Sequence, residues 1–390
     1  MVVALATMCS AFPVFLTGAL GVQLRDDLGL SATEIGIAMG TGFAVATVLS
    51  APMGRVAERL GPRRAFRCGL ATSALSMVMI ALLAHAFWQF CVILGLSGAA
   101  NALNQPSANL LLATHVGPQR LGFALATKQS GMPAAALLGG AAVPAIALTL
   151  GWEWAYVLGA AIAVTALGLL PPDTPTPGSD GDRPVVPSGR PTRALRAAAR
   201  PDLGTRLLVL YAVVGLLGST AAGAMVGFIT SGAEESGMSP GLAGLVLSLG
   251  SFVGIVSRIV QGWQVDRKGV LPIQRVVWLF GLGGLGVLLL AVDVPATYLV
   301  APIPAFAFGW AWPGLFNLSV IRNNPSAPAA ATGISQVGVF AGAAIGPAAG
   351  GIIIDNGGYR ALWIFGGVGL LLGSMLATYL RARIIANRAP

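Results

Sequence analysis

Apolar stretches of about 20 residues recur along the whole chain, separated by short polar segments. An α-helix rises about 1.5 Å per residue, so a stretch of this length crosses the ~30 Å hydrocarbon core of a bilayer. Of the 390 residues, 55% are hydrophobic and only 9% are charged, whereas soluble domains carry about 25% charged residues. The pattern therefore predicts an all-α integral membrane protein.

The apolar stretches number twelve, six on each side of a polar central segment. The predicted transmembrane helices are residues 2–24, 34–54, 66–84, 88–112, 122–148, 154–171, 205–230, 240–262, 274–292, 296–320, 330–354 and 360–381. The central segment is rich in Pro, Gly, Ser, Thr and Arg, which is typical of a flexible linker. We therefore expect an N-terminal six-helix bundle (1–171), a linker (172–204) and a C-terminal six-helix bundle (205–390).

The net charge of +9 comes from arginines that gather in alternate loops. The arginine-rich set includes the linker and the C-terminal tail, and the other loops hold most of the acids, such as Asp26, Asp27 and Asp293. Because positive loops stay on the cytoplasmic side, the linker and both termini are expected to be cytoplasmic. Basic residues distributed in this way do not indicate nucleic-acid binding.

The excess of arginine, alanine and glycine suggests a GC-rich bacterial genome, hence the bacterial inner membrane.

An internal repeat supports the division into two halves. Residues 29–61 align without a gap on residues 237–269, and the match includes the polar loop positions Glu58 with Asp266 and Arg59 with Arg267. Shared glycines alone could arise from composition, but an acid followed by an arginine at the same loop position is a more specific match. The two halves are therefore predicted to be structural repeats.

The loop after the second helix of each half resembles the loop signature of the major facilitator superfamily, a glycine followed by an acid, an arginine and a second glycine. The residues that carry the resemblance are Gly54, Glu58, Arg59, Gly61, Gly262, Asp266, Arg267 and Gly269. The resemblance implies two pseudo-symmetric bundles around one central site and a gating role for these residues. Glycine would let helices approach closely, and the acid would hold a neighbouring helix N-terminus or pair with arginine. The alternative is that these charges only set the topology.

Two cations lie inside predicted spans, Lys128 in the fifth and Arg258 in the eighth. A charge near the bilayer centre costs about 2.5–3.5 kcal/mol on insertion scales, so each should face a cavity or a partner. Apart from Glu34 at the very start of one span, the predicted spans contain no acid to pair with them, and an anionic substrate could supply the missing charge. Arg258 could instead extend to the membrane edge or bind helix carbonyls.

The repeat places Ser50 at the position that matches Arg258, so the loop does not itself require arginine. Arginine there resembles the oxalate–formate and monocarboxylate branches of the superfamily.

Polar and aromatic residues on neighbouring spans could complete a substrate cavity. The candidates, besides Lys128 and Arg258, are Gln129, Asn104, Gln105, Tyr211, Trp310, Asn317 and Gln336. The alternative for the amides is hydrogen bonding between helices, and for the aromatic residues it is core packing or an interfacial position.

These observations lead us to expect a transporter that moves a small organic anion, a carboxylate, by alternating access. The expected partners are that substrate and the lipid bilayer, while a coupling proton stays open, and we expect a monomer. The sequence shows no catalytic, cofactor or metal-binding constellation and so predicts no enzyme. The alternatives are multidrug or metabolite efflux by proton antiport, which usually needs a buried acid, and a membrane sensor.

Overall fold

The computed structural model describes residues 2–115, 127–170, 202–268 and 271–386, and every regular element in these ranges is a helix. Many large apolar side chains lie on the outside of the molecule, among them Val48 (75% exposed), Met375 (70%) and Trp88 (64%). A soluble monomer rarely exposes so much contiguous apolar surface. In the part of the chain that the structure describes, seven helices are long and apolar enough to cross a membrane, or eight if the bent pair at the N-terminus forms one span.

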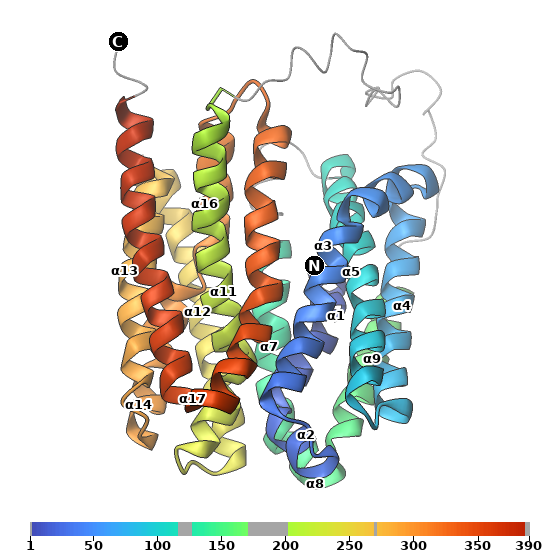
Figure 1. Cartoon of the computed structure of the whole chain (residues 1–390). Helices are drawn as coiled ribbons and strands as arrows, with labels where there is room; N and C mark the ends of the chain where they lie inside the picture. Colours follow the sequence, from blue (N-terminus) through green and yellow to red (C-terminus); the bar gives the residue numbers. More distant parts are fainter. Residues whose placement is uncertain (1, 116–126, 171–201, 269–270, 387–390) are drawn as a thin grey trace.

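The helices gather into two groups in chain order (Figure 1). The first group consists of α1 (Val2–Ala19), α2 (Gly21–Leu28), α3 (Ala32–Leu60), α4 (Pro62–Leu83), α5 (Phe87–His115), α7 (Gly131–Ala142), the π-helical turn η1 (Val143–Ala147), α8 (Leu148–Leu150) and α9 (Trp152–Gly168). The second consists of α11 (Thr205–Glu235), α12 (Pro240–Lys268), α13 (Pro272–Leu290), α14 (Pro295–Val300), α15 (Pro302–Gly309), α16 (Pro313–Arg322) and α17 (Pro328–Ala386). We call them the N-half and the C-half.

Several predicted spans are not single straight helices. The first bends by 60° between α1 and α2, and residues 296–320 form the three short helices α14, α15 and α16. Each of these three begins with a proline, which has no N–H and so interrupts the helical hydrogen-bond ladder. Residues 330–354 and 360–381 lie within α17, which breaks at Gly358 with a φ of 74°. These interruptions and the 17-residue length of α9 account for most of the difference between the twelve predicted spans and the seven long apolar helices of the described residues, and α5 is also not among the seven.

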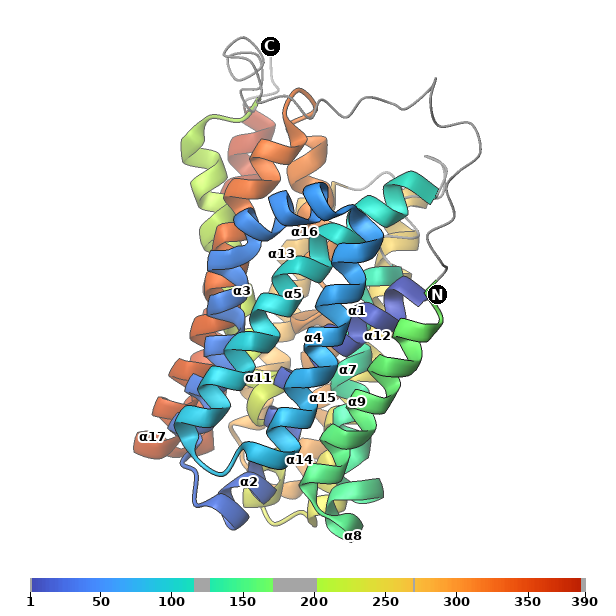
Figure 2. The same cartoon turned by 90° about the vertical axis from the view of Figure 1, so that its right-hand side faces the viewer.

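Small residues bring the two halves into close contact. Helix α3 packs on α17, α7 on α12 and α1 on α11, and Figure 2 shows the same arrangement from the side. An ideal Cβ at Gly40 would lie 2.6 Å from the carbonyl oxygen of Ala344, and one at Gly244 would lie 2.6 Å from that of Gly140. Helices in a membrane gain little from the hydrophobic effect when they associate, because lipid is as apolar as their side chains. Close backbone approaches of this kind hold them together by van der Waals packing instead.

Polar contacts join the halves at the end that carries α2, which we call the α2 end. The carboxylate of Asp355 accepts hydrogen bonds from the backbone N–H groups of Ala32 (3.2 Å) and Thr33 (2.8 Å), in the first turn of α3. Nearby, Nη1 of Arg25 donates to the Tyr359 hydroxyl at 3.1 Å. These contacts, together with the backbone packing, close the α2 end. We call the opposite end, where α3 meets α4, the Gly61 end.

We expect Gly40→Val to open the α2 end, because the new side chain would overlap the α17 backbone and overpacking costs about 1–3 kcal/mol. Spin labels at Asp27 and Asn356, which are exposed residues of the N-half and C-half, would report the change as a longer interspin distance. Gly369→Val is the matched control, since a Cβ there meets no atom within 4 Å. An unchanged distance distribution in Gly40→Val would contradict the closure argument.

Candidate functional site

The guanidinium of Arg258 connects the two halves. It extends from α12, where Nε and Nη2 donate to the carbonyl oxygen of Trp310 at 3.2 and 2.7 Å, and Nη1 donates to that of Gln129 at 3.2 Å. Gln129 belongs to the N-half and Trp310 to the C-half. The guanidinium carbon also lies 5.1 Å from the centroid of the Trp310 ring. Arg258 therefore meets neutral carbonyl oxygens and an aromatic face.

The break in the chain between α15 and α16 supplies one of these carbonyls. Helix α15 ends at Gly309 and α16 begins at Pro313, so residues 310–312 lack a regular helical ladder. In a continuous helix the Trp310 carbonyl would accept from the N–H of Gly314, but the break in the ladder leaves this carbonyl available to another donor. The sequence expectation that Arg258 could bind helix carbonyls agrees with this geometry.

The ammonium of Lys128 lies within the N-half. Its side chain is 3% exposed, and Nζ donates to Oε1 of Gln105 on α5 at 2.5 Å. The same amide group donates through Nε2 to Oδ1 of Asn101 at 3.4 Å, and the hydroxyl of Ser10 on α1 donates to that same oxygen at 3.4 Å. Lys128 lies in the helical residues 127–129 just before α7, so a polar chain of Lys128, Gln105, Asn101 and Ser10 runs from there across α5 to α1.

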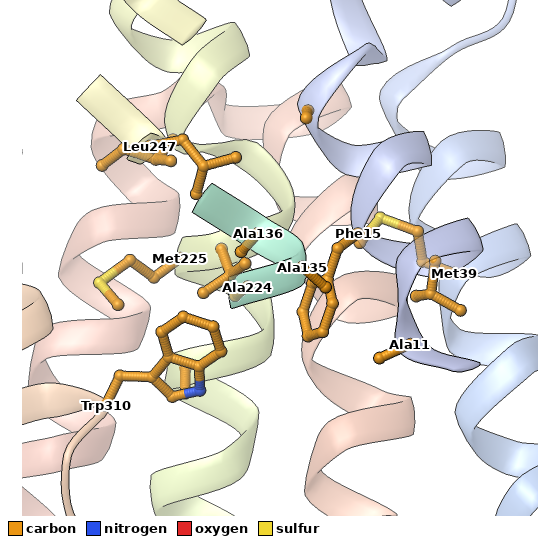
Figure 3. Packing of buried hydrophobic residues seen from close by; sticks show 14 of the residues in the cluster. Ala11, Phe15, Met39, Ala135, Ala136, Ala224, Met225, Leu247 and Trp310 are labelled. Atoms are coloured by element: carbon orange, nitrogen blue, oxygen red, sulfur yellow. The ribbon is translucent and has the colours of Figure 1, made fainter. Parts of the chain in front are cut away.

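Aromatic side chains meet between the halves beside Arg258. The rings of Phe15 on α1 and Trp310 lie 5.9 Å apart in an edge-to-face arrangement, and Phe306 lies 5.8 Å from Trp310 on its other side. Figure 3 shows Phe15 and Trp310 with Met225 and Ala135 in the same apolar cluster. The aromatic ring that contacts Arg258, Trp310, is therefore itself packed against a ring of the N-half.

A pair of amides lies on the C-half side. Nε2 of Gln336 on α17 donates to Oδ1 of Asn317 on α16 at 2.5 Å. Both residues are partly exposed within the molecule. The pair fits the expectation of hydrogen bonding between helices, and its remaining donors and acceptors are available for a ligand.

Two candidate residues lie away from this central arrangement. Asn104 is 1% exposed and lies against Gly69 on α4, and neither its Oδ1 nor its Nδ2 has a hydrogen-bond partner among the described residues. Tyr211 is fully buried in the C-half, where its hydroxyl is 2.7 Å from that of Ser319 and accepts from Nδ2 of Asn323 at 3.3 Å. Both positions suit helix packing.

The expected gating residues lie at the Gly61 end, at the junction of α3 with α4 and near the end of α12. Gly61 has a φ of 82°, a conformation that favours glycine at this turn. A Cβ at Gly54 or Gly262 would meet no described atom within 4 Å, so this conformation has no close helix approach there. The side chains of Glu58, Asp266 and Arg267 and the whole of Gly269 lie outside the described residues, and Arg59 is exposed.

Sequence reasoning missed the contacts at the α2 end. Asp355, Arg25 and Tyr359 come from three separate segments, and none forms a motif with its chain neighbours. The signal available in the sequence was Asp355 itself, an acid placed shortly before the Gly357-Gly358 pair that ends a span. Only the packing of α17 on α3 shows that this acid caps a helix of the other half.

A sequence profile of the Major Facilitator Superfamily matches residues 3–326, which is most of the chain and reaches across both halves. The chain belongs to this superfamily. The all-α fold expected from the sequence is thereby confirmed, and the protein is a multi-pass membrane transporter.

Relatives of this transporter are named for different functions. It is 24% identical over 334 residues to a gallate transporter of Pseudomonas putida, covering 78% of this chain and 73% of that one. It is 31% identical over 139 residues to the multidrug resistance protein MdtG of Proteus mirabilis, and 31% identical over 160 residues to an MFS-type efflux pump of Mycolicibacterium smegmatis. The last two matches cover 34% and 36% of those proteins.

We expect Tyr211→Phe to lower the thermal stability of the transporter without changing substrate affinity. The substitution removes one buried hydroxyl, whose hydrogen bonds contribute about 0.5–1.5 kcal/mol, while Ser319 and Asn323 still pair with each other. Thermal unfolding in detergent measures the first effect and equilibrium ligand binding the second. A marked loss of affinity with unchanged unfolding temperature would instead place Tyr211 in the substrate site.

Proposed function

We propose that this transporter moves a small organic carboxylate across the bacterial inner membrane by alternating access, with Arg258 as the principal anion-binding group. The observation that carries the proposal is the position of Arg258, a permanent cation between the two halves that is bonded to neutral carbonyl oxygens. The arginine-rich loops support a topology in which the linker and both termini are cytoplasmic.

A carboxylate suits this guanidinium better than the carbonyls that now hold it. Hydrogen bonds between two ionised groups are shorter and about twice as strong as neutral ones, and the planar guanidinium binds the two carboxylate oxygens side by side. An anion also offsets the cost of keeping a cation at membrane depth. Arg258 thus has a chemical reason to exchange the Gln129 carbonyl for a substrate.

Lys128 offers a second cation from the N-half. Its partner Gln105 is a neutral amide, and the ammonium is a compact charge that can rotate among acceptors. We propose that Lys128 and Gln105 contact the far side of the bound anion or its polar substituents. Gln336 and Asn317 could play the same role from the C-half, since their amides carry unused donors and acceptors.

The aromatic surface favours carboxylates that carry a ring. Phe15 and Trp310 lie edge-to-face beside Arg258, and aromatic pairs of this kind accept a further ring with about 0.5–1.5 kcal/mol beyond its area burial. The gallate transporter of Pseudomonas putida, named for an aromatic carboxylate with three hydroxyls, is a relative that aligns over 78% of this chain. We therefore propose benzoate-like acids as the first substrates to test.

Substrate binding would also loosen a contact between the halves. Nη1 of Arg258 is bonded to the N-half through Gln129, while Nε and Nη2 are bonded to the C-half through Trp310. A carboxylate that takes Nη1 breaks the bond to Gln129 and replaces it with a ligand that both halves can contact. Binding energy is in this way coupled to rearrangement of the halves.

Drug efflux is the second candidate, because two efflux proteins are 31% identical to parts of this chain. The chemistry of the central residues separates the candidates. A site built around arginine and lysine repels cationic drugs, whereas it attracts carboxylates.

The decisive measurement is a thermal-shift screen of purified transporter against benzoate-like acids, aliphatic carboxylates, sugars and cationic drugs. We expect the aromatic acids to raise the unfolding temperature in a concentration-dependent way. Arg258→Gln should weaken their binding at least about tenfold, because it removes charge-assisted hydrogen bonds worth about 1.5–3 kcal/mol each. Arg258→Lys should retain part of the affinity, and Lys128→Gln should have a smaller effect.

Arg206→Gln serves as the matched control, since Arg206 is an exposed arginine in the first turn of α11. Stabilisation by cationic drugs alone would overturn the anion hypothesis. The other informative outcome is that Arg258→Gln and Lys128→Gln bind carboxylates as tightly as wild type. That result would refute the assignment of these two residues and leave the substrate class in place.

A further inference from the structure

A groove of about 310 Å³ lies on the C-half, and its lining includes neither Arg258 nor the central amides. It is formed by α12, α13 and α15 and lined by Gln261, Arg275, Trp278, Leu279, Leu282 and Phe308. Trp278 is 61% exposed and Leu282 is 42% exposed, so the mouth of the groove lies on the outer apolar surface of the helices. In a multi-pass membrane protein that surface is in contact with lipid.

The polarity of the groove changes along its length. Arg275 lies in the first turn of α13 and Gln261 in the last two turns of α12, so both polar residues lie toward the Gly61 end. Leu279 and Leu282 follow Arg275 by four and seven residues on α13, which places them about 6 and 10 Å deeper along the helix axis. The groove thus has a polar, cationic end near the membrane surface and an apolar body farther in.

The polar end has unused binding capacity. Within the described residues Arg275 makes no hydrogen bond or ion pair, and Oε1 of Gln261 is a buried acceptor that also has no partner there. A buried acceptor without a partner carries a desolvation penalty, and a free guanidinium beside an apolar groove attracts an anion. A ligand that fits must therefore bring a negative charge, a hydrogen-bond donor and hydrocarbon.

We propose that this groove is a binding site for an anionic phospholipid, phosphatidylglycerol being the form that meets all three requirements. Its phosphate pairs with Arg275, an acyl chain lies along Leu282 and Phe308 above the buried Leu279, and a glycerol hydroxyl donates to Oε1 of Gln261 once that amide turns into the groove. The exposed ring of Trp278 borders the headgroup region, where tryptophan is enriched in membrane proteins. This site is separate from the substrate site, and a failure of either proposal leaves the other intact.

The occupant is a lipid rather than a soluble anion because of where the groove opens. Its mouth lies between side chains that face hydrocarbon, and four of its six lining residues are apolar. A soluble phosphate would gain only the Arg275 contact and would leave the apolar body of the groove unfilled. Burying hydrocarbon there contributes about 25 cal/mol per Å² of apolar surface that is not otherwise covered.

The test is native mass spectrometry of the purified transporter in detergent, titrated with phosphatidylglycerol, with phosphatidylcholine of the same acyl chains, and with glycerol phosphate. We expect one phosphatidylglycerol to bind before others, with phosphatidylcholine at least about tenfold weaker and glycerol phosphate giving no adduct. Arg275→Gln should weaken the first phosphatidylglycerol about tenfold, Arg275→Lys should retain most of the affinity, and Gln261→Leu should reduce the preference over phosphatidylcholine.

Arg206→Gln is again the matched control, because it removes an arginine from the start of another span without touching the groove. Size-exclusion profiles and helical circular dichroism establish that each variant is folded. Equal binding of both phospholipids to wild type, or an unchanged first site in a folded Arg275→Gln, would overturn the proposal. Glycerol phosphate binding as tightly as the phospholipid would show a small-anion site and refute the lipid assignment.

Discussion

The arrangement around Arg258 depends on one constraint, that a permanent cation inside a membrane protein must be surrounded by acceptors. Two of its hydrogen bonds go to Trp310, where prolines interrupt the tenth span, and one goes to Gln129 in the other half. A straight helix would have used the Trp310 carbonyl in its own ladder. The broken span and the intramembrane cation are therefore complementary, because the span supplies an acceptor that the cation needs.

The α2 end follows a different principle. There the halves are held by close backbone packing, with Gly40 against Ala344, and by Asp355 at the N-terminus of α3. Such contacts require small side chains and a short, fixed distance between the two helix backbones. They therefore form together when the helices approach and are lost together when the helices separate. In the proposed mechanism the centre exchanges carbonyls for substrate, whereas the α2 end changes between a packed and a separated arrangement. Alternating access needs this combination of an adaptable site and a bistable interface.

Much of this arrangement was predictable from local residues, and the rest was not. Lys128 and Arg258 could be identified because a charge within an apolar span is costly wherever the helix packs. The same reasoning could not separate Gln105, which holds Lys128, from its neighbour Asn104, which faces α4 one residue away. Which side of a helix faces the centre depends on all its neighbours, and nearly uniform hydrophobicity around α5 removes the amphipathic signal that identifies a buried face in soluble proteins.

By itself the sequence determined the membrane class, the all-α fold, the internal repeat and the two intramembrane cations. These follow from hydropathy, repeat matches and the energetic cost of a charge in hydrocarbon, which act on each segment separately. Only the tertiary structure decided that Arg258 contacts Trp310 and Gln129, while its repeat counterpart Ser50 bonds to Ala46 within its own helix. The physical reason is that a hydrogen bond between distant segments depends on the distance and direction set by packing, which no single segment encodes.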